Sequence, residues 1–166
     1  MTTTPSFLTR TVIVAVLALL TSAPVTVASS RSSKERAIRL CVNDERRARG
    51  LVPLQYDADL SRAARLHADD MRNQGFFDHQ DPQGRGPSER VALFTDRFFG
   101  AGENIYAGPR TASAACLDWM ASPGHRANFL EPDYRFFGTG FAAGGRWGTY
   151  WVQDFAYAPE AADAQQ

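Results

Sequence analysis

The hydrophobic pattern of this chain changes its period after residue 130, and this change limits the folds that the chain can adopt. Before that point, apolar residues recur every three or four positions, as in amphipathic helices. After it, residues 136–143 and 148–156 are rich in aromatic and β-branched side chains, and Gly144-Gly145 between them is typical of a hairpin turn. We therefore predict one α+β domain in which helices lie against an antiparallel sheet.

The helices before that point are delimited by capping residues and glycines. The three longer helices each have an expected start whose side chain can cap backbone N–H groups, and glycine is a common helix end. The expected helices run from the capping-box residues Ser32 to Glu35 up to Gly50, from Asp57 to Gly75, over the short segment 87–94, and onward from Thr111. The second of them presents Leu60, Ala64, His67 and Met71 on one face.

The ends of the chain have the composition of segments outside the domain. Residues 1–28 combine Arg10, a short apolar run and a small-residue stretch with a cleavage position after Ala28 or Ser29, which is the order of a secretory signal peptide. We assign 33–158 to the domain and 159–166 to a disordered tail. The protein is then secreted, extracellular or associated with the cell envelope. The alternative is an uncleaved N-terminal membrane anchor.

Charge and cysteine content narrow the function classes. The chain carries 18 basic and 18 acidic residues, so no basic patch dominates and no electrostatic argument favours nucleic acid or an anionic membrane as partner. Its two cysteines, Cys41 and Cys116, allow a disulfide in an exported protein. Two separate buried thiols are the alternative.

Three polar residues lie at or beside irregular segments, where side chains distant in sequence can converge. They are His79 in FFDHQDP, Glu103 in GAGENIY and His125 in SPGHRAN. Two imidazoles and a carboxylate are usable ligands for zinc or another divalent metal, with other positions open to water. The alternative is that each residue stabilises its own loop. His67 lies on an apolar helix face and is expected in the core.

Five segments resemble, in order, the superfamily of cysteine-rich secretory, antigen 5 and pathogenesis-related proteins, also called the CAP or SCP domain, in its bacterial form. They are NDERRARGLVPLQYDADLSRAARLHADDM, FFDHQDP, GENI, DWMASPGHRANFLEPDYRFFGTGFA and TYWVQDFA, and they cover nearly everything from Cys41 to Ala156. The resemblance implies a three-layer α-β-α sandwich with a central antiparallel sheet. It also implies a surface cavity lined by two histidines and two acidic residues, which match His79, His125 and Glu103.

The fourth cavity position departs from the family pattern. The second acidic residue of the family stands five positions before the helix tryptophan, and this chain has Ala114 there. Asp118 lies one helical turn further on the same face, but its backbone is about 6 Å away along the axis. The expected cavity residues are therefore His79, Glu103, His125 and Asp118, with a weakened or absent metal site.

These observations favour a secreted binding module for a cell-envelope, lipid or protein ligand. The alternative is a metal-assisted hydrolase in the same cavity, with Glu103 as general base, and a structural envelope protein is a third reading. Catalytic residues are not assigned. The pairs Phe76-Phe77 and Phe98-Phe99 flank the irregular region, and each either exposes one ring or packs both inward.

Overall fold

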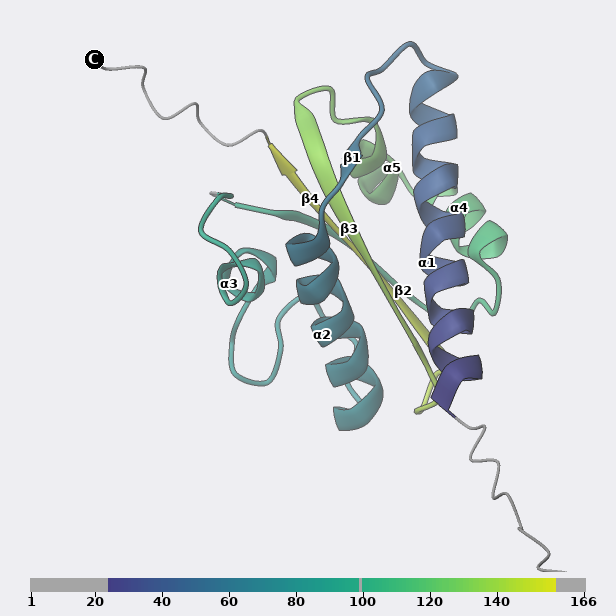
Figure 1. Cartoon of the computed structure of the whole chain (residues 1–166), viewed down its shortest axis with the longest axis vertical. Helices are drawn as coiled ribbons and strands as arrows, with labels where there is room; N and C mark the ends of the chain where they lie inside the picture. The colour runs from purple at the N-terminus through teal and green to yellow at the C-terminus, as the bar shows by residue number, and fades with distance from the viewer. Residues whose placement is uncertain (1–23, 99, 158–166) are drawn as a thin grey trace, which may run out of the picture.

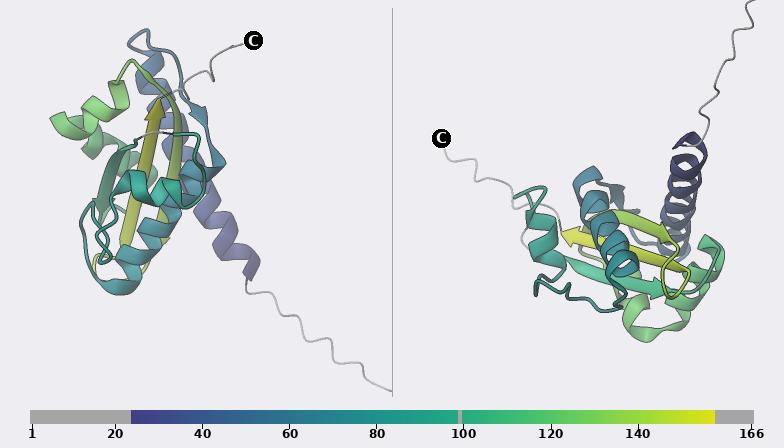
Figure 2. Two further views of the ribbon diagram at one scale, coloured as in Figure 1. Left: turned by 90° about the vertical axis from the view of Figure 1, so that its left-hand side faces the viewer. Right: turned by 90° about the horizontal axis from the view of Figure 1, so that it is seen from below.

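The computed structural model describes residues 24–98 and 100–157, and these form three layers (Figure 1). Helices α2 and α3 cover one face of the sheet, whereas α1, α4 and α5 cover the other (Figures 1 and 2). The predicted α-β-α sandwich is confirmed. In chain order the elements are α1 (Pro24–Arg47), β1 (Gln55–Tyr56), α2 (Ala58–Gln74), α3 (Pro87–Ala92), β2 (Gly102–Ala107), α4 (Ala112–Ala121), α5 (Pro123–Leu130), β3 (Tyr134–Ala143) and β4 (Thr149–Tyr157).

The sheet is mixed, which corrects the expectation of a purely antiparallel one. Its strand order is β1-β3-β4-β2, and the predicted hairpin of β3 and β4 forms its centre. Strand β2 is antiparallel to β4, but β1 runs parallel to β3. A strand of two residues has no alternation that a sequence pattern could show. It pairs only Gln55 with Phe136 and Tyr56 with Phe137, before the chain turns into α2.

Helix α1 begins at Pro24, not at the predicted capping box, so Ser32 to Glu35 lie inside it. Proline is tolerated in the first turn of a helix, and no glycine or proline follows until Gly50. The polar segment before Ser33 is therefore helical as well. The predicted signal peptide lies outside the described residues except for 24–28, and the predicted tail 159–166 lies outside them entirely.

Helix α2 follows the sequence prediction closely. The Asp57 carboxylate accepts hydrogen bonds from the backbone N–H groups of Asp59 and Leu60, at 2.9 and 3.0 Å. Gly75 ends the helix with φ of 71°, a left-handed conformation that favours glycine. The four residues predicted on its apolar face are all fully buried.

Two glycines of β3 allow α2 to approach the sheet unusually closely. A Cβ atom at Gly138 would lie 2.2 Å from the carbonyl carbon of Leu60, and one at Gly140 would lie 2.3 Å from that of Ala64. Such distances exclude any side chain without a backbone shift. The glycines of FFGTGFAA thus define the contact between the helix and the strand.

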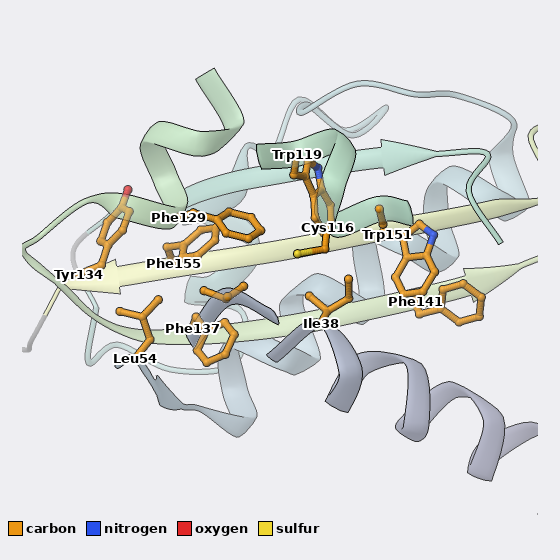
Figure 3. Packing of buried hydrophobic residues seen from close by; sticks show 12 residues of the cluster. Ile38, Leu54, Cys116, Trp119, Phe129, Tyr134, Phe137, Phe141, Trp151 and Phe155 are labelled. Carbon is orange, nitrogen blue, oxygen red and sulfur yellow. The ribbon is translucent and has the colours of Figure 1, made fainter. Parts of the chain in front are cut away.

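The largest hydrophobic cluster lies between the sheet and the layer of α1, α4 and α5 (Figure 3). Trp119, Phe129 and Phe155 pack together there, with ring centroids 6.1 and 6.3 Å apart along the row. Cys41 of α1 and Cys116 of α4 form a disulfide at the edge of this cluster, with Cα atoms 6.5 Å apart. The disulfide interpretation is therefore confirmed over that of two separate thiols.

Candidate functional site

The candidate site is built on Glu103 of the edge strand β2. GENI was expected at an irregular segment, but Gly102 to Ala107 pair in register with β4, so Glu103 has a fixed backbone. Its side chain is 1 % exposed. One carboxylate oxygen lies 2.7 Å from Nδ1 of His79, and the other accepts a hydrogen bond of 2.5 Å from Arg90. Both oxygens are therefore engaged.

The two predicted histidines line one pocket of about 430 Å³ beside this strand. His79 comes from the connection between α2 and α3, and its side chain is about half exposed. His125 lies in the first turn of α5, after Ser122 at the N-cap and Pro123 at the first helical position, as predicted. Phe77, Ile105 and Tyr106 supply the aromatic and aliphatic part of the wall.

The two imidazoles have opposite electrostatic environments. The hydrogen bond to Glu103 raises the pKa of His79 above its usual value, because the carboxylate stabilises the imidazolium. Burial lowers the pKa of His125, and the proximity of His79 lowers it further. As the pH falls, His79 therefore takes up a proton before His125 does. The positive charge of the pocket then lies on the side formed by the connection between α2 and α3.

Asp118 does not enter the pocket directly. Its carboxylate accepts a hydrogen bond of 2.8 Å from the hydroxyl of Tyr106, which is a wall residue. This contact raises the pKa of the Tyr106 hydroxyl, because ionisation would place two negative charges side by side. Asp118 thus contacts a residue of the wall and is not among the residues that line the pocket.

Two asparagines that sequence reasoning did not identify hold α5 against β2. Asn104 donates to the backbone carbonyl of His125 at 3.0 Å. Asn128 donates to the backbone carbonyl of Glu103 at 3.1 Å and to the side chain of Asn104 at 2.8 Å. They are the asparagines of GENI and SPGHRAN, so the two motifs contact each other and fix the distance between strand and helix.

Arg90 and His67 form a buried polar layer below the pocket. Arg90 is fully buried and donates to the backbone carbonyls of His79 and Arg85, each at 2.8 Å, in addition to Glu103. His67 is buried as predicted, and its Nε2 lies 2.9 Å from the backbone carbonyl of Asp78. Because a carbonyl only accepts, this nitrogen is the donor. Burial lowers the pKa of His67 and favours its neutral form.

Asp154 of β4 is the least expected member of this layer. It stands directly opposite Glu103 in the sheet and is fully buried, and neither of its oxygens has a donor among the described residues. Burial, with the charge of Glu103 as a second cause, raises the pKa of Asp154 well above its usual value. The layer thus holds Arg90, His67, the carboxylate of Glu103 and an acid whose burial favours the neutral form, which can donate to Glu103. The signal in the sequence was an acidic residue within a strand of mainly aromatic and aliphatic residues.

The three predicted metal ligands do not form a ligand group in this arrangement. Within residues 24–98 and 100–157, no three His, Cys, Asp or Glu side chains are placed to hold a metal ion. Glu103 is turned towards Arg90 and His79, so its carboxylate orients an imidazole instead of facing the pocket. The residues therefore do not fit a metal centre with three protein ligands.

Comparison with known proteins identifies the family. The model of the cysteine-rich secretory protein family, CAP, matches residues 40–155. The chain belongs to the CAP family. This match contains every element from β1 to β3 and nearly all of β4, and so includes the whole candidate site.

Bacillus subtilis has two relatives of this CAP domain that cover most of the chain. It is 38 % identical over 135 residues to the uncharacterized protein YkwD of Bacillus subtilis, which covers 81 % of this chain and 50 % of that protein. It is 30 % identical over 110 residues to the uncharacterized membrane protein YlbC of the same organism, covering 66 % of this chain and 32 % of that one. The chain thus spans half or less of the length of these relatives.

Solved structures show the same fold. An extracellular protein of Bacillus anthracis that contains an SCP domain matches 81 % of this chain and 44 % of its own with a TM-score of 0.73 at 27 % identity. An outer surface protein of Borrelia burgdorferi matches 76 % of this chain and 93 % of its own, with a TM-score of 0.70 at 17 % identity. Among the described residues of this CAP domain, no helix combines the length and apolarity needed to cross a bilayer.

Proposed function

We propose that this CAP domain is an extracellular binding module whose ligand is an amphipathic molecule of the cell envelope. The observation that carries the proposal is the pocket of about 430 Å³, in which apolar side chains adjoin two imidazoles. A pocket with mostly apolar walls and a few placed polar groups is the usual form of a small-molecule site. The extracellular SCP-domain protein of Bacillus anthracis supports the assignment to the outside of the cell.

The charge on His79 determines which end of a ligand it binds. Glu103 orients the ring, Arg90 donates to Glu103 and to the backbone carbonyl of His79, and the raised pKa of His79 extends its protonated form to higher pH. An imidazolium donates to an anionic or strongly accepting group. The apolar part of the ligand then packs against Phe77, Ile105 and Tyr106.

A titration with dodecanoate tests this function, because this probe has one carboxylate and one apolar chain. We expect saturable one-to-one binding by calorimetry at pH 6, weakened about tenfold in His79→Gln, since a lost charged contact contributes roughly 1.4 kcal/mol or more. Gln80→Ala changes the next exposed residue of the same connection and is the matched control. Equal affinity of His79→Gln and the wild-type protein would contradict the proposal.

Hydrolysis is the second candidate, favoured by the contact between His79 and Glu103. A buried carboxylate that orients an exposed imidazole is the arrangement of a general base. The metal-assisted form has less support, because the described side chains form no ligand group of three. Ester and phosphodiester substrates, assayed with and without chelator, would separate the candidates: turnover that disappears in His79→Gln would favour a hydrolase.

A further inference from the structure

A second, smaller pocket of about 200 Å³ lies at the opposite edge of the sheet, between α1 and β1. Three arginines line it, Arg36, Arg39 and Arg47, together with Asn43 and with apolar and aromatic residues around Tyr56. None of the described residues that line it is acidic. A concave surface that gathers three guanidinium groups without a lining carboxylate has the chemistry of an anion site.

Helix geometry explains why the arginines converge. Arg36, Arg39, Asn43 and Arg47 follow one another at intervals of three, four and four residues, which places them along one face of α1. This helix carries six basic residues and three acidic ones, and although Arg46 is buried, the three arginines of the pocket form a local positive surface that the neutral total of the chain does not show. The sequence argument from net charge did not detect it.

Contacts of Arg39 and Asn43 fix parts of the pocket and leave the N–H groups of the Arg39 guanidinium free to donate to a ligand. The Arg39 guanidinium lies over the Tyr56 ring at 4.3 Å from its centroid, which restrains the side chain without using its N–H groups. Asn43 exchanges two hydrogen bonds with the backbone of Leu54, at 2.8 and 3.0 Å, and so fixes the chain between α1 and β1.

The other two arginines, Arg36 and Arg47, have few or weak contacts with other residues of the protein. Arg47 contacts Asp44 at 2.9 Å, but both side chains are more than half exposed, and such surface pairs contribute little. Arg36 is exposed and has no hydrogen bond or ion pair among the described residues. Like charges brought together in this way repel one another, and an anion bound between them would relieve this repulsion.

We propose that this pocket binds a phosphate monoester or diester group. A tetrahedral phosphate presents oxygens in several directions, so guanidinium groups from three positions can each donate to it. A carboxylate presents two oxygens in one plane and suits a single guanidinium fork. The group is carried by an anionic lipid headgroup or by a soluble or polymeric phosphate ester outside the cell. This site is separate from the imidazole pocket and does not depend on the function proposed for that pocket.

Titration with sn-glycerol 3-phosphate, followed by amide NMR, tests the proposal and locates the site. We expect saturable shifts around Arg36, Arg39, Arg47 and Tyr56, with at least tenfold weaker binding in Arg36→Gln/Arg39→Gln. The matched control is Arg62→Gln/Arg126→Gln, which removes the same charge from exposed positions elsewhere. Thermal unfolding of each variant verifies that it is folded, and the shifts of the wild-type protein locate the site without any variant.

Acetate and lipid vesicles complete the experiment. Acetate should bind at least tenfold more weakly than glycerol phosphate. Binding to phosphatidylglycerol vesicles but not to phosphatidylcholine vesicles supports the proposal with a lipid as the source, and binding to glycerol phosphate alone supports it with a soluble or polymeric source. Non-saturating shifts at arginines throughout the protein, equal weakening in the control, or equal affinity for acetate would overturn it.

Discussion

Replacing Asp154 by asparagine tests whether the fold buries a neutral acid beside Glu103. Asparagine has nearly the same shape, and its amide can donate to Glu103 as a protonated acid could. Asp154 is fully buried and has a strongly raised pKa, so it keeps its proton in the folded state at pH values where the unfolded chain loses it. The unfolded state then binds fewer protons, and the free energy of unfolding falls as pH rises.

The size of the effect follows from the binding of one proton by Asp154. Below the pKa of this aspartate in the unfolded chain, near 3.8, Asp154 is protonated in both states and the wild-type protein loses no stability. Above it, the wild-type protein loses about 1.4 kcal/mol per pH unit until the folded state also ionises. The Asp154→Asn variant lacks this loss, so its stability relative to wild type should increase by about 1.4 kcal/mol between pH 4.5 and pH 5.5.

Urea unfolding at several pH values measures this difference. His67 and His79 titrate in both proteins, so comparing the two removes most of their contribution. The exposed Asp133→Asn reports any general effect of removing an aspartate. A constant difference between wild type and Asp154→Asn from pH 4.5 to 5.5 would show that Asp154 is already ionised in the fold and would refute the reasoning.

Three further predictions concern other contacts. Glu103→Gln should lower the pKa of His79, and NMR titration of the ring protons measures this change. Because Glu103 raises that pKa in the folded protein, the pair stabilises the fold at pH values below the pKa of a histidine in the unfolded chain, about 6.5. This contribution is lost as pH rises through the pKa of His79 in the folded protein. Serine at both cysteines should reduce the free energy of unfolding by about 4.5 kcal/mol, because the disulfide spans 75 residues, and unfolding in guanidinium measures this loss. Gly138→Ala should cost about 3 kcal/mol or more in the same assay, because its Cβ would contact the α2 backbone at 2.2 Å, whereas Gly124→Ala, with open space around it in α5, should be neutral or stabilising.

The sequence predicted the elements whose ends and faces have a local chemical cause. Asp57 and Gly75 define α2 because capping and left-handed backbone are properties of single residues, and the β3–β4 hairpin follows from its period and its two glycines. It did not predict β1, whose pairing depends on where α2 begins, or the start of α1 at Pro24, because a helix can continue through a capping motif.

The sequence predicted which residues form the candidate site better than it predicted their contacts. The family motifs pointed to the residues, and the structure brings His79 and His125 to one pocket with Glu103 in contact with His79. The sequence could not show that Arg90 occupies the second oxygen of Glu103, since they meet only when α3 packs against β2. Asp154 was missed because helices cover both faces of the sheet at β4, and the sequence of a single strand does not show how the other layers pack against it.

The hydrogen bonds of Asn104 and Asn128 join β2 to α5, so the imidazole pocket depends on the folding of the whole domain. The walls of the pocket come from a connection, an edge strand and a helix that are distant in sequence, so no fragment of the chain can retain the pocket after the layers separate. Any ligand that occupies it at a hundred times its dissociation constant would raise the stability of the entire domain by about 2.7 kcal/mol. Resistance to heat or to proteases would then report occupancy of the pocket, even for a ligand whose chemistry is still to be determined.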